Sequence, residues 1–345
     1  MQAATKVVVD DWSTVKHSPL VSIPTNELKN PHKVISFFAG CGGLDLGFLG
    51  GFRYKGTNHK KLPFDIKAAY DSNEKAVSTY NSNIGNHCHV MDLADVNPLK
   101  LPAADLLIGG FPCQDFSSCG PKAGLTSKRG RLYQTLISYM TTHRPKVVVG
   151  ENVPNLARMG GGSVIDTIVR DLKGAGYHFE VWTLFAPDYG VPQNRMRLFF
   201  VGVRDDIYDI HGGPVQPRRT HAENHRSIDW AIGDLENVID ESIRNQSQYF
   251  KASKAKKGNG QGDETNRAGL PSYTIRANAK SRVQFHYKLP RRLTVRECAR
   301  LQTFPDNFSF DFSATTNVMQ IGNAVPPLLA HRVAVSIASF MNKIR

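Results

Sequence analysis

The sequence lacks the segments that would carry a chain into or across a membrane. Its 345 residues contain no run of eighteen apolar residues, so we expect no membrane span. Residues 1–11 do not show the basic and then apolar pattern of a secretory signal peptide. Together these absences predict a soluble protein of the cytoplasm.

The sequence also lacks a cysteine pattern for zinc or for a set of disulfides. It has five cysteines, an odd number, and no two are spaced as Cys-x-x-Cys. We therefore expect no metal and reduced thiols, as in a cytosol. The cysteines interpreted as ordinary small residues are Cys41, Cys88, Cys119 and Cys298.

Acidic residues are too few to balance the basic ones. The chain has 43 lysines and arginines against 30 aspartates and glutamates, a formal net charge of +13. The excess is uneven, because residues 244–300 hold fourteen lysines and arginines and only three acidic residues. Such a field attracts phosphates, so we expect a polyanionic partner; a basic protein without one is the alternative.

From residue 33 onward, apolar strands alternate with helices. Helix patterns separate most of the strands, and the last two strands are expected to pair as a hairpin. This alternation predicts an α/β fold with a doubly wound, mostly parallel sheet. Helices are also expected at 293–301, where Thr294 and Glu297 form a capping box, and at 325–341. The expected strands lie at 34–38, 64–70, 88–91, 103–108, 147–149, 179–185 and 197–203.

One cysteine directly follows an expected strand. Residues 103–108 lead into Gly-Gly-Phe-Pro-Cys-Gln at 109–114. Pro112 stiffens this loop, and the carboxyl ends of strands are where open α/β sheets bind ligands. A thiol at such a place can attack an electron-poor ring carbon near neutral pH. Cys113 is therefore the candidate nucleophile.

A glycine-rich turn follows the first expected strand. Residues 38–44 read Phe-Ala-Gly-Cys-Gly-Gly-Leu and lead into a helix whose first amides lack partners. Asp45 stands where the dinucleotide fingerprint requires its third glycine, which disfavours a pyrophosphate. A nucleotide-type cofactor or a tight turn without a ligand would both explain this loop. The candidate cofactor residues are Phe38, Gly40, Gly42, Gly43 and Leu44.

Two aspartates follow the next two expected strands. Asp71 is placed to bind a pair of ribose hydroxyls, and Asp92 to accept a hydrogen bond from an adenine amino group. Aspartate is also a good helix cap, so each could instead cap the following helix. Ligand-like features at three successive strand ends favour the cofactor site.

A glutamate and two arginines complete the candidate catalytic set. Glu151 ends a strand of three valines, where a carboxyl could hold or share a proton with a ring nitrogen. Arg195 and Arg197 lie on one face of an extended segment, and one of them could bind a carbonyl oxygen of a base. The alternatives are a buried salt bridge for Glu151 and structural ion pairs for the arginines.

Six segments, in this order, resemble the bacterial DNA (cytosine-5)-methyltransferases. They span nearly the whole chain from residue 33, and six ordered motifs are far more specific than a lone Pro-Cys. Two departures are small: Ser36 stands where the family often has an acidic residue, and Cys41 where an apolar one is frequent. The matching segments are 38–44, 110–117, 151–153, 193–197, 292–305 and 320–326.

The resemblance implies a Rossmann-like fold that binds S-adenosylmethionine as methyl donor and releases S-adenosylhomocysteine. Pro112, Asn323 and Val325 would complete the cofactor pocket. A cytosine would be flipped out of the duplex, as methyltransferases of bases require. Cys113 would attack its C6, Glu151 would hold N3, and Arg197 or Arg195 would bind O2.

The resemblance also implies a domain division. Residues 33–203 with 310–345 would form the catalytic and cofactor-binding domain, 204–309 a target-recognition domain, and 1–32 an arm of unknown role. Double-stranded DNA would lie between the two domains. The protein would act as a monomer. A restriction endonuclease that cuts the same DNA site is a possible functional partner. The expected DNA contacts are Gln114, Ser117, Arg129 and Arg131 on a lid, and Thr274 and Arg276 in the recognition domain.

Other functions stay as alternatives. A cytosine-5 methyltransferase of transfer RNA would share the chemistry, but the large basic segment disfavours it. A silent DNA-binding relative would not need Cys113, Glu151 and the two arginines. Asp45 disfavours a nicotinamide dehydrogenase, and methylation of amino groups has no need of a cysteine nucleophile.

Overall fold

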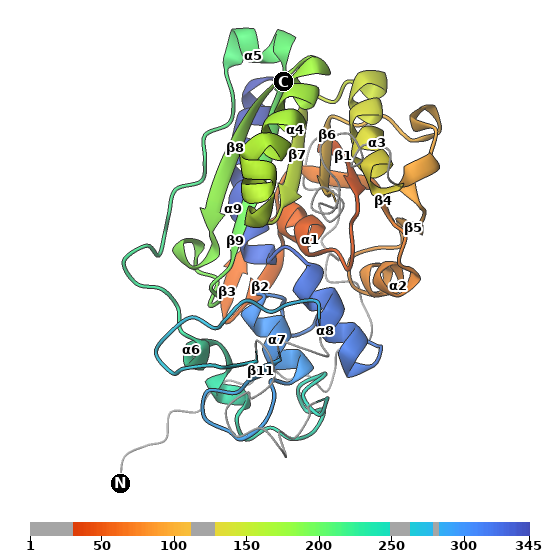
Figure 1. Ribbon diagram of the computed structural model, residues 1–345. Coiled ribbons are helices and arrows are strands. Elements are labelled where there is room, and N and C mark those ends of the chain that lie inside the picture. The colour runs from red at the N-terminus through yellow and green to blue at the C-terminus, as the bar shows by residue number, and fades with distance from the viewer. Residues whose placement is uncertain (1–29, 112–127, 249–262, 279–282) are drawn as a thin grey trace.

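Seven strands form one twisted sheet in the order β5-β4-β1-β6-β7-β9-β8 (Figure 1). The computed structural model describes residues 30–111, 128–248, 263–278 and 283–345. Neighbouring strands are parallel, except that β9 runs against both β7 and β8. The expected mostly parallel α/β sheet and the final antiparallel pair are confirmed. The strands are β1 (His32–Phe37), β4 (Phe64–Asp71), β5 (Cys88–Val90), β6 (Leu106–Gly110), β7 (Val147–Asn152), β8 (Tyr177–Phe185) and β9 (Met196–Arg204).

Helices cover both faces of this sheet. Along β6, Leu106 and Ile108 join the apolar cluster of one face, and Leu107 joins the cluster of the other. Such strands are apolar throughout because parallel sheets are buried on both sides. Helices α1 (Gly43–Leu49), α2 (Glu74–Asn83) and α9 (Pro327–Lys343) contribute to the first cluster, and α3 (Lys128–His143) and α4 (Ser163–Gly174) to the second.

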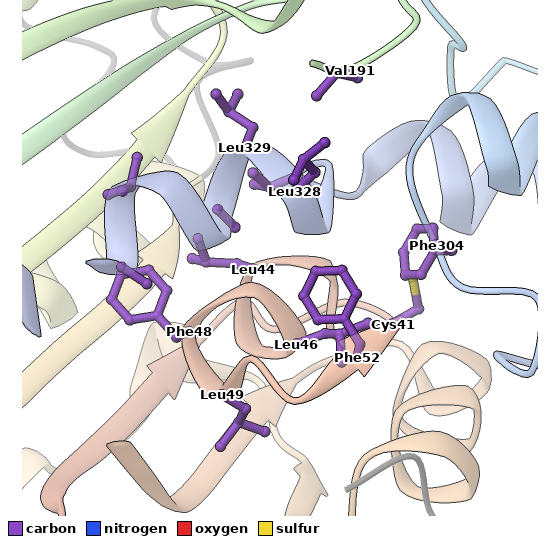
Figure 2. Close-up of a cluster of buried hydrophobic side chains, with 14 of the residues drawn as sticks. Cys41, Leu44, Leu46, Phe48, Leu49, Phe52, Val191, Phe304, Leu328 and Leu329 are labelled. Carbon is purple, nitrogen blue, oxygen red and sulfur yellow. The ribbon is translucent and has the colours of Figure 1, made fainter. Parts of the chain in front are cut away.

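Helix α1, near the beginning of the described chain, packs on α9, the last helix. Figure 2 shows Leu44 pointing from α1 toward α9, which carries Leu328 and Leu329. Gly47 makes this close approach possible, because a Cβ there would lie 2.3 Å from the Cβ of Ala330. The C-terminal segment therefore belongs to the same core as the glycine-rich turn.

Helix α9 and the helix before it pass a length and hydropathy test for a membrane span but are buried in the core of the protein. Residues 314–343 are long and apolar enough to cross a membrane, but 72% of their most apolar window is buried inside the protein. They comprise two helices, α8 (Ala314–Asn323) and α9, separated by a short break before Pro327. The sequence had predicted only the second of these helices, at 325–341. Burial on this scale is typical of core helices.

Short elements make up the region below the sheet in Figure 1. They are α6 (Ile228–Ile232), the parallel pair β10 (Glu264–Thr265) and β11 (Gln284–Phe285), and α7 (Val295–Leu301). Helix α5 (Asp205–His211), which directly follows β9, lies at the opposite end of the sheet, at the top of the view. The capping box expected at α7 is confirmed: Thr294 Oγ1 accepts from Glu297 N at 3.0 Å, and Thr294 N donates to the Glu297 carboxylate at 2.8 Å. The domain boundaries at 203/204 and 309/310 stay a prediction. Single-turn 3-10 helices lie at Leu93–Asp95, Pro98–Lys100, Ala186–Tyr189 and Gly233–Leu235, and a longer 3-10 segment at Pro154–Gly162.

A hairpin that the sequence did not suggest links α1 to this lower region. Strands β2 (Phe52–Tyr54) and β3 (Thr57–His59) pair through a two-residue turn, in which Lys55 and Gly56 both have positive φ. Tyr54 Oη donates to Arg300 O at 2.8 Å, which ties the hairpin to α7.

The first strand begins one residue inside the expected N-terminal arm. His32 is a buried residue of β1, so the expected arm 1–32 extends slightly too far.

The buried cap of α7 makes a stability prediction. Besides capping the helix, the Thr294 hydroxyl donates to Gln246 Oε1 at 2.8 Å. Thr294→Ala should therefore lower the free energy of unfolding by about 1–2 kcal/mol. Thr294→Ser keeps the hydroxyl, so a urea titration should show a clearly smaller decrease in its free energy of unfolding. Equal decreases for the two variants would contradict a role for the hydrogen bonds.

Candidate active site

A cavity of about 440 Å³ opens at the edge of the sheet where β1, β4, β5, β6 and β7 end, here called the carboxyl edge. Ligands of open α/β sheets bind at such an edge. Glu151, the candidate catalytic carboxyl, also lines the cavity. In the described part of the chain, no group of three or more His, Cys, Asp or Glu is placed to hold a metal ion. The cavity brings together eight of the predicted cofactor residues: Phe38, Gly40, Gly43, Leu44, Asp71, Asp92, Asn323 and Val325.

The glycines of the turn after β1 serve three different purposes. A Cβ on Gly40 would meet nothing within 4 Å, so this glycine leaves its side of the cavity open. A Cβ on Gly43 would lie 2.4 Å from Val325 O, so this glycine allows contact with the start of α9. A Cβ on Gly42 would lie 2.2 Å from Ile84 Cδ1, so Gly42 serves packing on α2 and is not part of the cavity wall.

Phe38 adopts an unusual backbone conformation at the cavity. Its φ is +56°, in the left-handed region that costs most residues about 1–2 kcal/mol. The side chain is half-buried and lines the cavity, where an aromatic face can stack on a ligand ring. Strain of this kind is common where a loop is shaped for binding.

Asp71 fixes the glycine-rich turn to the end of β4. Its Oδ2 accepts from Gly40 N at 2.9 Å, and its Oδ1 accepts from Asn73 N at 2.8 Å. Burial raises the pKa of this carboxyl above its usual value. Asn73, not Asp71, caps α2. Each carboxylate oxygen keeps capacity for a further hydrogen bond, as the predicted ribose contact requires.

Asp92 shows the capping role that the sequence left open. Its Oδ1 accepts from Ala94 N at 3.0 Å and so caps the short 3-10 turn Leu93–Asp95. The residue nevertheless lines the cavity beside Met91 and Leu93. The cap holds the carboxyl at the cavity wall, so capping the 3-10 turn is compatible with the predicted contact to a ligand.

Glu151 and Arg197 form a close ion pair at the carboxyl edge. Because β9 runs against β7, its beginning lies beside the end of β7, with Asn152 opposite Leu198. Arg197 Nε lies 2.6 Å from Glu151 Oε1, and their side chains are only 10% and 12% exposed. The salt bridge that the sequence left as an alternative for Glu151 is therefore present. Glu151 lines the cavity, so the pair places a carboxyl group in the wall with a cation directly beside it.

Arg195 occupies a different place from Arg197. Its side chain is fully buried, with Nη1 donating to Ile275 O at 3.0 Å and Nη2 to Gly322 O and Ala324 O, each at 2.9 Å. Burial lowers the pKa of this guanidinium well below its usual value. Neither arginine lines the cavity itself, but Arg197 is paired with a residue that does, Glu151. Of the two candidate arginines, the geometry therefore favours Arg197 as the one that meets a base.

The predicted recognition residues lie next to Arg195. The Thr274 hydroxyl donates to Asn194 O, and Arg276 is half-buried. A Cβ on Gly322 would lie 2.4 Å from the backbone carbon of Arg276, so this segment touches the end of α8 directly. The structure therefore joins residues 274–277 to the cavity wall, while base reading by Thr274 and Arg276 stays a prediction.

Several predicted residues lie outside the described part of the chain. These are Pro112, the candidate nucleophile Cys113, Gln114 and Ser117. Arg129 and Arg131 belong to the first turn of α3, without described side chains. Gly110, three residues before Cys113, does face the candidate catalytic carboxyl, because a Cβ there would lie 3.1 Å from Glu151 Oε2.

Asp45 and Gln320 are among the polar residues of the cavity wall that the sequence did not single out as site residues. Asp45 is fully buried in the first turn of α1, where Tyr80 Oη donates to its Oδ1 at 3.1 Å. Gln320 comes from α8 and is 4% exposed. Asp45 follows the glycine-rich turn directly, which was a usable signal. Gln320 was not predictable in this way, because only the tertiary fold brings α8 to the turn, where Cys41 Sγ lies 3.6 Å from Gln320 O.

Known proteins share this architecture. Solved structures similar over most of the chain include a DNA modification methyltransferase encoded within a prophage of E. coli (TM-score 0.65, 20% identity, 90% of this chain and 100% of that one). Another is the Entamoeba histolytica methyltransferase EhMeth (TM-score 0.68, 15% identity, 92% and 100%). At these identities the likeness establishes the fold, a Rossmann-like methyltransferase fold.

Sequence comparison is more specific. The chain is 34% identical to the Type II methyltransferase M.BspRI of Lysinibacillus sphaericus, over 89% of this chain and 81% of that one. It is 32% identical to M.NgoFVII of Neisseria gonorrhoeae, over 90% and 88%. The C-5 cytosine-specific DNA methylase family matches residues 32–339, from the first residue of β1 to near the end of α9. The chain belongs to the C-5 cytosine-specific DNA methylase family.

Proposed function

We propose that this DNA (cytosine-5)-methyltransferase methylates a flipped-out cytosine of a specific duplex sequence through a covalent bond between Cys113 and C6. The observation that carries the proposal is the pair of Glu151 and Arg197, 2.6 Å apart, in which Glu151 lines a cofactor-sized cavity. Membership of the family supports the reaction and the DNA substrate. The residue roles rest on the geometry around the pair.

The cavity residues fit S-adenosylmethionine. A volume of about 440 Å³ lies within the usual range for pockets of small ligands. Asp71 would accept from the ribose hydroxyls, Asp92 would accept from the adenine amino group, and Phe38 would lie against the adenine ring. When bound, the cofactor supplies a methyl group on a cationic sulfur. Gly40 would allow its chain to approach the backbone, since a side chain there would stand in the open space.

Glu151 and Arg197 would bind and polarise the base. Arg197 would donate to O2, and the Glu151 carboxyl would share a proton with N3. Both contacts draw electrons from the ring, so C6 becomes open to attack by the Cys113 thiolate. The electron pair then reaches C5, which would take the methyl group as its bond to the cofactor sulfur breaks, leaving the uncharged S-adenosylhomocysteine. A base, with water as the simplest choice, removes the C5 proton, and the C6–S bond breaks to restore the thiolate.

Duplex DNA would lie against the basic region after residue 203. Residues 244–300 carry most of the excess positive charge, and phosphates bind such surfaces. Thr274 and Arg276 would meet base edges, while Gln114, Ser117, Arg129 and Arg131 would close over the flipped base. The contact of residues 274–277 with the end of α8 supports a recognition segment fixed beside the catalytic domain.

The biological setting that fits best is a restriction-modification system. The similar relatives are named as Type II methyltransferases of bacteria. Methylation would protect a short site against an endonuclease that cuts the same site. A monomer suffices for this role, because each strand can be methylated in a separate binding event.

The nucleophile assignment predicts a separation of chemistry from binding. Cys113→Ala should reduce transfer of labelled methyl groups to DNA by at least about 10³-fold, because the covalent route is lost. Its affinity for cognate duplex, measured by gel shift, should stay close to that of the unmodified enzyme. Methyl transfer at a normal rate by this variant would contradict the assignment.

The two arginines should fail in different ways. Arg197→Gln should slow methyl transfer by about 10²–10³-fold, through loss of a cation at the base. Arg195→Gln should chiefly lower the free energy of unfolding, by about 2–4 kcal/mol, because three backbone carbonyls lose their donor. Steady-state kinetics and urea titration of both variants separate these effects. An Arg195→Gln enzyme of normal stability but without activity would move the base contact to Arg195.

A further inference from the structure

The charge of the cavity is opposite to that of the whole chain. Four acidic residues line it: Asp45, Asp71, Asp92 and Glu151. Among the described residues of its wall there is no lysine, arginine or histidine, although the chain carries a formal net charge of +13. Glu151 is paired with Arg197, whereas neither Asp45 nor Asp71 forms an ion pair among the described residues. A low-dielectric wall strengthens the attraction of such a site for a cation.

Asp45 is the most deeply buried of these groups. It has no exposed surface, and its Oδ1 accepts from Tyr80 Oη at 3.1 Å. Tyr80 Oη lies 3.0 Å from His87 Nε2, and His87 is half-buried. The hydroxyl of Ser36, on β1, is the other neighbour that favours the ionised carboxyl. Asp45 is thus connected through Tyr80 and His87 toward the surface.

The groups that face Asp45 provide no fixed positive charge. Burial lowers the pKa of His87 and raises that of Tyr80, so both are neutral near pH 7. Cys41 on the glycine-rich turn and Cys88 on β5 are buried thiols whose pKa burial raises. Asp71, at the end of β4, acts on Asp45 as a like charge. Burial, with this like charge, raises the pKa of Asp45 to about 7.

A second buried polar group marks the same wall as a binding surface. Gln320 is 4% exposed and lines the cavity. Neither polar atom of its side chain has a hydrogen-bond partner within the described residues. A buried carboxamide without a partner costs free energy, so the wall has polar capacity that a ligand can satisfy. The acidic wall is therefore part of a ligand site and not a cluster of surface charges.

We propose that Asp45 makes the cavity select a ligand that carries a positive charge, and that its carboxyl releases a proton when that ligand binds. The inference rests on the proposed function, because it takes a sulfonium cofactor as the ligand. S-adenosylmethionine and S-adenosylhomocysteine differ by the methyl group and one positive charge. Asp45 would therefore favour the donor over the spent product by an amount that depends on pH.

The direction of this dependence follows from the protonation of Asp45. Below about pH 7 the free cavity holds Asp45 as the neutral acid, and a bound cation favours the ionised form. Binding of the donor then costs a proton, which leaves for solvent by way of Tyr80 and His87. The affinity for the donor should rise with pH and level off above about pH 7. The affinity for the uncharged sulfide should change much less.

Calorimetric titration of the apoprotein with both ligands tests the inference. Between about pH 5.5 and pH 7.5, the ratio of donor affinity to product affinity should rise about five- to tenfold. Titrations in two buffers of different ionisation enthalpy should show proton release with S-adenosylmethionine and little with S-adenosylhomocysteine. In Asp45→Asn the ratio should be nearly independent of pH. Asp206→Asn, which removes an equal charge from an exposed ion pair with Arg204, should behave as the unmodified protein.

The possible failures are distinct. If neither ligand binds at any pH, the proposed function is wrong. If both bind but the ratio stays flat, or rises equally in Asp45→Asn, the function stands and the role of Asp45 is wrong. Loss of the pH effect in Asp71→Asn alone would likewise overturn the assignment. Thermal melting shows whether Asp45→Asn is folded. If it is not folded, the unmodified protein provides the test: proton release with S-adenosylmethionine supports the proposal, and its absence overturns it.

Discussion

The antiparallel insertion of β9 into an otherwise parallel sheet is the constraint on which the candidate site depends. Parallel strands end at one edge, and the reversed strand begins at that edge. Arg197 at the start of β9 and Glu151 near the end of β7 are thereby brought to 2.6 Å of each other. A fully parallel sheet would place the arginine at the opposite edge. Glu151 of this pair lines the same cavity as the residues at the ends of β1, β4 and β5.

The C-terminal segment closes this site from the other side. Helices α8 and α9 supply Gln320, Asn323 and Val325 to the cavity, and α9 packs on α1 over Gly47. Arg195 holds the carbonyls of Gly322 and Ala324 together with that of Ile275. One buried guanidinium therefore ties the wall of the cavity to the predicted recognition segment, and a shift of either would disturb the other.

Local patterns in the sequence predicted most of the sheet and much of the cavity. Apolar strands, the capping box of Thr294 and Glu297, and the aspartates at strand ends all depend on neighbours in the chain. Contacts between distant segments were not predictable in this way. Gly42 packs on Ile84 because α2 lies beneath it, and Arg195 and Arg197 differ only in what the fold places around them. Gln320 entered only as the first residue of the matching segment 320–326, with no role of its own, and the hairpin at β2 and β3 had no local signal strong enough to single it out.

The central claim is a transient bond between the Cys113 sulfur and C6 of a flipped cytosine. Duplex DNA with 5-fluorocytosine at the target position tests it directly, because fluorine cannot leave C5 as the proton does and the adduct persists. With S-adenosylmethionine present, the account predicts a protein–DNA complex that survives denaturing electrophoresis and maps by mass spectrometry to the peptide containing Cys113. Absence of that complex on a duplex that the enzyme methylates, or attachment through another residue, would contradict it.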